Sequence, residues 1–373
     1  MTRARGLSLM LACLTVGAVL ATALAPSALG GFRARRQFFG LGGWNWPSHR
    51  EVRKLSHRGL RQWRLTLAWG DVERSPGTYG WAGYDQVIAD LVSHRMSVLL
   101  DLTGCPDWVC HRGGFGPPRP QAARQRWLAF VRAAVQRYGT NGSFWGSHPG
   151  LAYRPVRYWQ VLNEVNGADQ WPNPSAADYA ALLKPTSATI RSVDPSSKVV
   201  LAGLGKHMTI LLKDYLPALY QQRGFSGDVD AIAVEGYAER PRQIVGIMRL
   251  TRGIMRRYGD RRTPVWITEM GWATGGGNHP YVTSRRGQAK KLRLSWDMLY
   301  ACRRHWRLKR VYWFPHRDQL VPPGGTDYWG YHNGLITVGG RWKPAMRTLL
   351  HYVRKRMPRG HRMHCRSAIR ATR

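Results

Sequence analysis

Three consecutive segments, VDAIAVEGY (229–237), RQIVGIMRLTRGIMRRYGD (242–260) and PVWITEMGW (264–272), decide the fold of this 373-residue chain. The first and third are short apolar runs of strand length, and the second is an amphipathic run of helix length. A strand, a helix and another strand in this order are typical of a parallel sheet, because the helix returns the chain to the edge where the next strand starts.

The same alternation runs through most of the sequence and predicts eight strands, at 37–44, 60–69, 97–103, 156–164, 198–205, 229–237, 264–272 and 310–316. Eight strand-helix units between residues 31 and 356 predict an α/β protein with a single (β/α)8 TIM barrel. The competing fold is a doubly wound open sheet. No glycine fingerprint for a phosphate follows the first strand, which disfavours it.

The two ends of the chain differ from the predicted barrel. Residues 1–30 begin with two Arg, continue with an apolar stretch and end in small residues, which predicts a secretory signal peptide. We therefore expect a protein that is secreted or associated with the cell envelope. An uncleaved anchor is the alternative, because the apolar run approaches the ~18 residues that can span a membrane. The basic tail, 357–373, is expected to be a partly disordered, solvated extension.

Four cysteines follow the predicted signal peptide, and an exported chain permits disulfides between them. Cys105 and Cys110 could close a single loop, and Cys302 with Cys365 would tie the tail to a late helix. The sequence alone establishes neither bridge. Neither spacing resembles a zinc site, and we found no His and carboxylate cluster at metal-ligand spacing. No metal or other cofactor is expected.

The chain is strongly basic, with 57 Lys and Arg against 21 Asp and Glu and a formal net charge of +36. Such a charge fits an anionic polysaccharide or an electrostatic association with the cell envelope. The basic residues are scattered over every segment, and no nucleic-acid recognition motif accompanies them, so we expect no nucleic-acid partner. The excess of Arg over Lys also fits codon bias in a GC-rich genome.

Glutamate is scarce, and two of the six Glu residues end predicted strands that lie across the barrel mouth from each other. Glu164 ends the fourth strand and Glu269 the seventh. The carboxyl ends of barrel strands meet at one mouth, where active sites form. Two facing carboxylates suit the hydrolysis of a glycosidic bond: a separation of about 5 to 5.5 Å would mean retention of configuration, and a wider one inversion.

The motifs around these residues resemble those of the clan A glycoside hydrolases, nearest their family 39 and family 5 branches. These enzymes share an Asn-Glu pair after strand four and a Glu after strand seven, here VLNEVNG and WITEMGW. The resemblance implies a retaining mechanism in which Glu164 is the general acid/base and Glu269 the nucleophile. It also implies that Asn163 hydrogen-bonds the 2-hydroxyl of the sugar being cleaved.

Further motifs extend the resemblance over residues 38–352. The stretch WRLTLAWGDVERSPGTYGW (63–81) resembles the passage after strand two in the same branches, which makes Arg64 the partner that keeps the nucleophile ionised. Tyr237 matches the strand-six position that hydrogen-bonds the nucleophile. Trp313 and the following HNGLITVGGRWKPAMRTL resemble the strand-eight Trp and the closing segment of the family.

One position departs from the pattern. Many family 39-like sequences carry a His two residues before the strand-six Tyr, and Glu235 stands there in this chain. Glu235 is either a third carboxylate at the mouth or a strand-end residue paired with an Arg. Sugar rings pack on aromatic planes, so Trp44, at the end of the first strand, joins Trp313 as a candidate for substrate binding. Weaker candidates near the mouth are Trp69, Trp108, Trp171, Trp272, His207 and His316.

Together these residues predict a monomeric, exported glycoside hydrolase that cleaves the O-glycosidic bonds of an oligo- or polysaccharide by double displacement. The alternative is a non-catalytic carbohydrate- or envelope-binding protein on the same barrel. A site that had lost its activity need not have kept Glu164, Glu269, Asn163 and Arg64 together.

Overall fold

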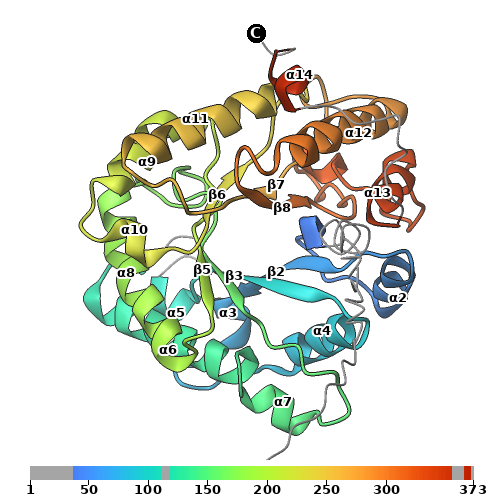
Figure 1. Cartoon of the computed structure of the whole chain (residues 1–373). Helices are drawn as coiled ribbons and strands as arrows, with labels where there is room; N and C mark the ends of the chain where they lie inside the picture. The colour runs from blue at the N-terminus through green and yellow to red at the C-terminus, as the bar shows by residue number, and fades with distance from the viewer. Residues whose placement is uncertain (1–36, 111–117, 355–364, 371–373) are drawn as a thin grey trace, which may run out of the picture.

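A computed structural model of the chain describes residues 37–110, 118–354 and 365–370 and contains eight parallel strands (Figure 1). Seven hydrogen-bonded pairs give the order β5-β4-β3-β2-β1-β8-β7-β6. Bridges from Val200 to Ala231 and from Leu204 to Val234 then join β5 to β6 and close the ring. The predicted single (β/α)8 barrel is confirmed. The strands are β1 (Phe39–Gly43), β2 (Gln62–Ala68), β3 (Ser97–Thr103), β4 (Tyr158–Val161), β5 (Lys198–Val200), β6 (Ile232–Glu235), β7 (Val265–Glu269) and β8 (Leu308–Trp313).

Helices surround the barrel, and the longer ones pack against its outer surface (Figure 1). Those that connect successive strands are α2 (His49–His57), α3 (Trp69–Val72), α4 (Ala82–Ser93), α5 (Asp107–Cys110), α6 (Gln121–Tyr138), α7 (Ser143–Ser147), α8 (Ala176–Val193), α9 (Leu212–Tyr220), α10 (Phe225–Asp228), α11 (Gln243–Arg257) and α12 (Arg285–Cys302). After β8 come the short 3-10 helix η1 (Trp329–His332), then α13 (Pro344–Arg354) and α14 (Cys365–Arg370).

Side-chain caps set the start of several helices. Ser175 precedes α8 and accepts a hydrogen bond from the backbone N–H of Asp178. Ser48 and Glu51 form a reciprocal capping box at the start of α2. Glu51 is thus a structural residue, and its cap directs the chain from β1 into the first long helix.

The fourth and fifth strands are shorter than predicted. Regular β4 pairing ends at Val161, and Leu162 and Glu164 have positive φ angles of 64° and 44°. The predicted strand at 198–205 pairs regularly only through Val200. After β4 the backbone departs from strand geometry at the barrel mouth, which is where Glu164 lies. After β5 the chain still forms isolated bridges at Gly203 and Leu204.

Both candidate disulfides are formed. Cys105 pairs with Cys110 inside the loop that follows β3, and Cys302 pairs with Cys365 with a Cα separation of 4.7 Å. The second bridge fastens α14, which is the described part of the predicted tail, to the end of α12. Residues 365–370 are therefore helical and attached to the barrel, in contrast to the solvated extension expected there.

The predicted signal peptide (1–30) and tail residues 357–364 and 371–373 lie outside the described residues. Within the described ranges, no helix is both long enough and apolar enough to cross a membrane.

Candidate active site

A cavity of about 540 Å³ opens at the carboxyl ends of the strands and collects the candidate residues. Its wall includes residues that follow six different strands, so the barrel closure itself brings them together. The lining residues are Trp44, Arg64, Thr66, Asp101, Thr103, Asn163, Glu164, Asp169, Gln170, Gly205, Lys206, His207, Met208, Glu235, Tyr237, Glu269, His279, Tyr281, Phe314, Pro315, Tyr328, Trp329, Gly330 and Asn333.

Arg64 lies at the base of this cavity and is almost completely buried. Its guanidinium donates to Glu269 Oε1 at 2.7 Å, Asp101 Oδ2 at 2.7 Å, Asn163 Oδ1 at 3.0 Å and Gln160 Oε1 at 2.9 Å. The nearby carboxylates raise the Arg64 pKa above its ordinary value, although burial opposes this. Arg64 is thus a permanent positive charge that connects strands β2, β3, β4 and β7.

Glu269 ends β7 and is held by three donors. Arg64 and Asn163 both donate to Oε1, the latter at 3.2 Å, and the Tyr237 hydroxyl donates to Oε2 at 3.0 Å. The predicted contacts of Arg64 and Tyr237 with this carboxylate are therefore present. The orientation of Glu269 is fixed before any ligand arrives.

Arg64 lowers the pKa of Glu269, in the direction expected from the sequence, but other groups around this carboxylate oppose it. Burial raises the pKa of Glu269 to about 7, and the negative charge of Glu164 adds to this effect. Arg64 and the Tyr237 hydrogen bond lower the pKa, while burial and the charges of Glu164 and Asp101 raise it, and the net shift is upward.

Glu164 follows Asn163 at the end of β4, opposite β7 in the barrel. Its backbone N–H donates to the Gly203 carbonyl at 3.0 Å, and Asn163 forms a parallel bridge with Gly203. A Cβ on Gly203 would lie 2.6 Å from Thr268 Oγ1, 2.8 Å from Asn163 Oδ1 and 2.9 Å from Glu235 Oε1. A glycine is required here, because the site side chains occupy the space that a larger residue would fill.

Glu235 is the third carboxylate of the cavity and is only 1% exposed. Neither of its oxygens has a hydrogen-bond donor among the described residues, so no Arg pairs with it. Burial and the negative charges of Glu164 and Glu269 raise the pKa of Glu235 well above its ordinary value. Glu235 therefore lies in the cavity as a third carboxyl group and is not paired with an Arg, which answers the question left open by the sequence.

Aromatic side chains form the upper wall of the cavity. Trp44 is 45% exposed and packs edge to face against Phe314. Across the mouth, the ring of His279 stacks on Trp329 with 5.1 Å between centroids, and Tyr281 lies against the same indole. Flat apolar faces of this kind suit the C–H faces of sugar rings.

Trp313 is placed differently from its prediction. It is fully buried, its indole N–H donates to the Asn333 carbonyl at 2.9 Å, and it is not among the lining residues. The next residue, Phe314, lines the cavity instead. Alternation along β8 explains the difference, since adjacent side chains of a strand point to opposite faces.

Of the weaker candidates near the mouth, one lines the cavity and the others do not. His207 lines the cavity. His316 is completely buried, and burial lowers its pKa to about 4. The remaining Trp candidates pack or hydrogen-bond away from the lining residues, and they are Trp69, Trp108, Trp171 and Trp272.

Sequence reasoning missed two partners of Arg64. Asp101 and Gln160 are polar residues within the otherwise apolar runs SVLLDLT and YWQVL. A polar side chain inside a barrel strand faces either the solvent-free interior or the site, and this signal could have identified both. The loop residues Tyr281 and Trp329 gave no comparable signal. Loops lack the regular hydrophobic pattern from which strands and helices are predicted, so the direction of a loop side chain cannot be predicted in the same way.

Among known proteins, several solved structures have a fold similar to that of this chain. No family model matches the chain, and no curated protein matches it. A family 39 glycoside hydrolase from Bacteroides cellulosilyticus WH2 is similar in structure, with a TM-score of 0.65, 18% identity and coverage of 86% of this chain and 64% of that chain. This chain thus spans less than two thirds of that protein.

Two further solved structures are similar. A monomeric β-xylosidase from Caulobacter crescentus CB15 has a TM-score of 0.61, 20% identity and coverage of 84% of this chain and 67% of that chain. A GH5_18 protein from Bifidobacterium longum subsp. infantis has a TM-score of 0.62, 15% identity and coverage of 85% of this chain and 78% of that chain. These barrels include both branches that the sequence motifs resemble, and at such identities the likeness concerns the fold.

Proposed function

We propose that this protein is an exported retaining glycoside hydrolase that acts on an oligo- or polysaccharide, with Glu164 as general acid/base and Glu269 as nucleophile. The observation that carries the proposal is the presence of both carboxylates in one cavity, where Arg64, Asn163 and Tyr237 hold Glu269 by hydrogen bonds. Two carboxyl groups with different environments are the minimum that double displacement needs.

In the first step Glu164 gives its proton to the leaving glycosidic oxygen while a carboxylate oxygen of Glu269 attacks the anomeric carbon. The bond between that carbon and the leaving oxygen breaks, and a glycosyl ester of Glu269 forms. In the second step ionised Glu164 takes a proton from water, which attacks the same carbon and releases Glu269. Arg64 stabilises the Glu269 carboxylate at the start and end of the cycle.

The raised pKa of Glu235 bears on the total charge of the site. An ionised Glu235 would place a third negative charge beside Glu164 and Glu269. The protonated form adds no charge, and Arg64 keeps its ion pairs with Asp101 and Glu269. The raised pKa of Glu235 therefore favours proton binding in the folded protein.

Substitution Glu235→Gln is expected to change how stability depends on pH. The folded state binds the Glu235 proton more tightly than the unfolded state, so this contribution is complete below pH 4.5 and is lost as pH rises toward the folded pKa. An amide does not titrate, so the Tm of the variant minus that of wild type should increase from pH 4 to pH 8. Expressed as free energy of unfolding, the difference between variant and wild type should change by at most about 1.4 kcal/mol per pH unit.

The control for this measurement is Glu239→Gln, at a side chain that is 45% exposed and outside the cavity. Its Tm difference from wild type should stay constant over the same pH range. A constant difference for Glu235→Gln as well would show that residue 235 does not hold a proton in the folded state.

Substitution Trp44→Ala is expected to raise KM about tenfold, equivalent to ~1.4 kcal/mol of lost binding, with a smaller change in kcat. The indole face of Trp44 lines the cavity, so its loss removes a packing surface for the sugar. Trp46→Ala is a matched control, because Trp46 is 43% exposed and packs on Tyr84 away from the lining residues. Equal KM values for the two variants would show that Trp44 does not contact the substrate.

The proposal is tested by supplying a panel of aryl glycosides and following release of the phenol. At least one sugar should be hydrolysed, and the first sugar product should keep the anomeric configuration of the substrate, as followed by NMR. Binding of sugars without turnover of any panel member would instead support a carbohydrate-binding protein. Inverted product would refute the double displacement.

A further inference from the structure

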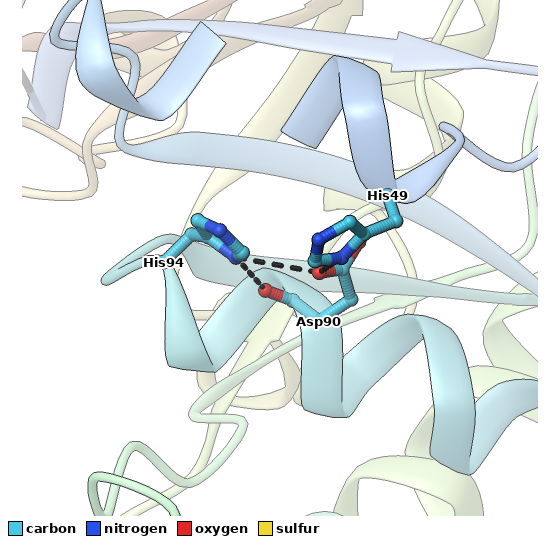
Figure 2. A group of neighbouring side chains, drawn as sticks. All are labelled: His49, Asp90 and His94. Atoms are coloured by element: carbon cyan, nitrogen blue, oxygen red, sulfur yellow. Dashed lines mark hydrogen bonds and ion pairs between the residues drawn. The ribbon is translucent and has the colours of Figure 1, made fainter. Parts of the chain in front are cut away.

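Outside the cavity, two helices bring together a group of metal-ligand side chains. His49 is the first residue of α2, Asp90 lies in the last turn of α4, and His94 directly follows α4 (Figure 2). One ligand atom of each residue lies within 4.8 Å of the other two. None of the three is among the residues that line the cavity, so this group is separate from the proposed active site.

We propose that His49, Asp90 and His94 form a binding site for one divalent transition-metal ion of the zinc class. Two imidazole nitrogens and one carboxylate oxygen are a ligand set that suits zinc, and a water molecule would complete a tetrahedral shell. Mg²⁺ and Ca²⁺ prefer oxygen ligands, so this set disfavours them.

Both histidines already contact Asp90. His49 Nδ1 lies 2.7 Å and His94 Nδ1 3.3 Å from Oδ1 (Figure 2). His94 Nδ1 also lies 2.9 Å from the Asp90 carbonyl oxygen and 3.1 Å from Ser93 Oγ, and an ion at this nitrogen would displace these hydrogen bonds. Ligand atoms around a tetrahedral zinc with bonds of 2.0 to 2.1 Å lie roughly 3.3 Å apart. The His94 distance equals this value, the His49 distance is shorter, and all three ligand atoms lie within 4.8 Å of one another. Binding of an ion would therefore move the His49 ring outward and replace the hydrogen bonds of both rings.

The surroundings of Asp90 also favour a cation. A carboxylate in the last turn of a helix meets the negative end of the helix dipole, which is unfavourable unless a positive charge is near. Asp90 is also mostly shielded from water, with 14% of its side chain exposed, while His49 is 71% exposed and gives solvent access to the group. A bound divalent ion would offset both the dipole and the loss of solvent.

The two ligand-bearing segments are already fixed relative to each other. Trp46, three residues before His49, packs edge to face on Tyr84 at the start of α4 with 4.8 Å between ring centroids. The segment that carries His49 is therefore anchored to α4 by Trp46. An ion held by both segments would act as a cross-link between α2 and α4.

The test uses full-length protein stripped with a chelator and titrated with ZnCl₂ by calorimetry, with Tm measured in parallel. Wild type should bind one Zn²⁺ with an affinity at least tenfold higher than any site in the double variant His49→Ala/His94→Ala. Zinc should also raise the Tm of wild type, because a ligand that binds only the folded state stabilises it, and the rise should be lost in the variant.

Two controls keep the outcome decisive. His57→Ala removes another exposed histidine of α2 and should bind zinc as wild type does. Asp90→Asn keeps the size of the side chain and removes the charge, and it should lose affinity even if the double variant folds poorly. Equal zinc binding and equal Tm rise in wild type and the cluster variants would overturn the proposal, and an equal Tm rise with MgCl₂ would overturn the ligand class.

Discussion

Substitution Glu269→Ala is expected to lower kcat/KM for every aryl glycoside that wild type hydrolyses by about 10⁵-fold, the order of loss seen when a covalent nucleophile is removed from a hydrolase. Without this carboxylate no glycosyl ester can form, and the remaining site can only bind the sugar. KM should change far less than kcat, since the aromatic wall and Glu164 remain. The measurement is steady-state hydrolysis with freshly purified protein.

A matched control separates chemistry from folding in this experiment. Glu239→Ala removes an exposed carboxylate from the segment after β6 and should keep wild-type turnover. Thermal unfolding of Glu269→Ala should remain a cooperative transition, because Arg64 keeps Asp101 as its buried ionic partner. Turnover of Glu269→Ala at the wild-type rate would exclude this residue as the nucleophile.

Substitution Glu164→Ala is expected to act through the leaving group. A phenol of high pKa needs a proton as its bond breaks, so kcat/KM for such glycosides should fall by about 10² to 10⁴-fold. An activated phenol such as dinitrophenol leaves without help, so its glycoside should retain most of the wild-type rate of the first step. The measurement is a plot of log kcat/KM against the pKa of the leaving phenol.

The slope of that plot is the informative quantity. Wild type should depend weakly on leaving-group pKa and Glu164→Ala steeply, because only wild type donates a proton. A variant that lost activity through misfolding would instead lower all substrates equally. Parallel lines for wild type and Glu164→Ala would therefore contradict the acid/base role.

The barrel and the central contacts could be predicted from the sequence. The barrel follows from the regular alternation of strand-like and helix-like runs, and the contacts follow from which residues end the strands. Alternating apolar and amphipathic runs define eight units, and the ends of parallel strands meet at one mouth wherever the connections run. The pairing of Arg64 with Glu269, and of Tyr237 with the same carboxylate, could thus be predicted from strand numbers and family motifs.

Other features depend on distances that no motif specifies. Whether residue 313 or 314 faces the mouth depends on where β8 ends relative to the mouth, and an error of one residue exchanges Trp313 for Phe314. The pKa of Glu269 depends on how complete its burial is, which a list of neighbours does not give. The raised pKa of Glu235 likewise depends on its burial and on the charges of Glu164 and Glu269, with no Arg hydrogen-bonded to it.

The His49, Asp90 and His94 group shows the same limit. No metal site was expected from the sequence, because Asp90 and His94, four residues apart, are only two candidate ligands and such pairs are common without a metal. The third ligand comes from a different helix, 41 residues earlier, and only the packing of α2 on α4 brings it near.

The most direct test of the central claim is to trap the glycosyl ester with a 2-fluoro glycoside of a sugar that the enzyme hydrolyses. Fluorine slows both steps, and a good leaving group lets the ester form and persist. Trypsin would place Glu164, Glu235 and Glu269 in separate peptides, 158–191, 224–242 and 263–285. We predict that the peptide 263–285 alone gains the mass of the fluorosugar, at Glu269. Label on Glu164 or Glu235, or turnover of the parent glycoside with no labelled peptide, would contradict the account.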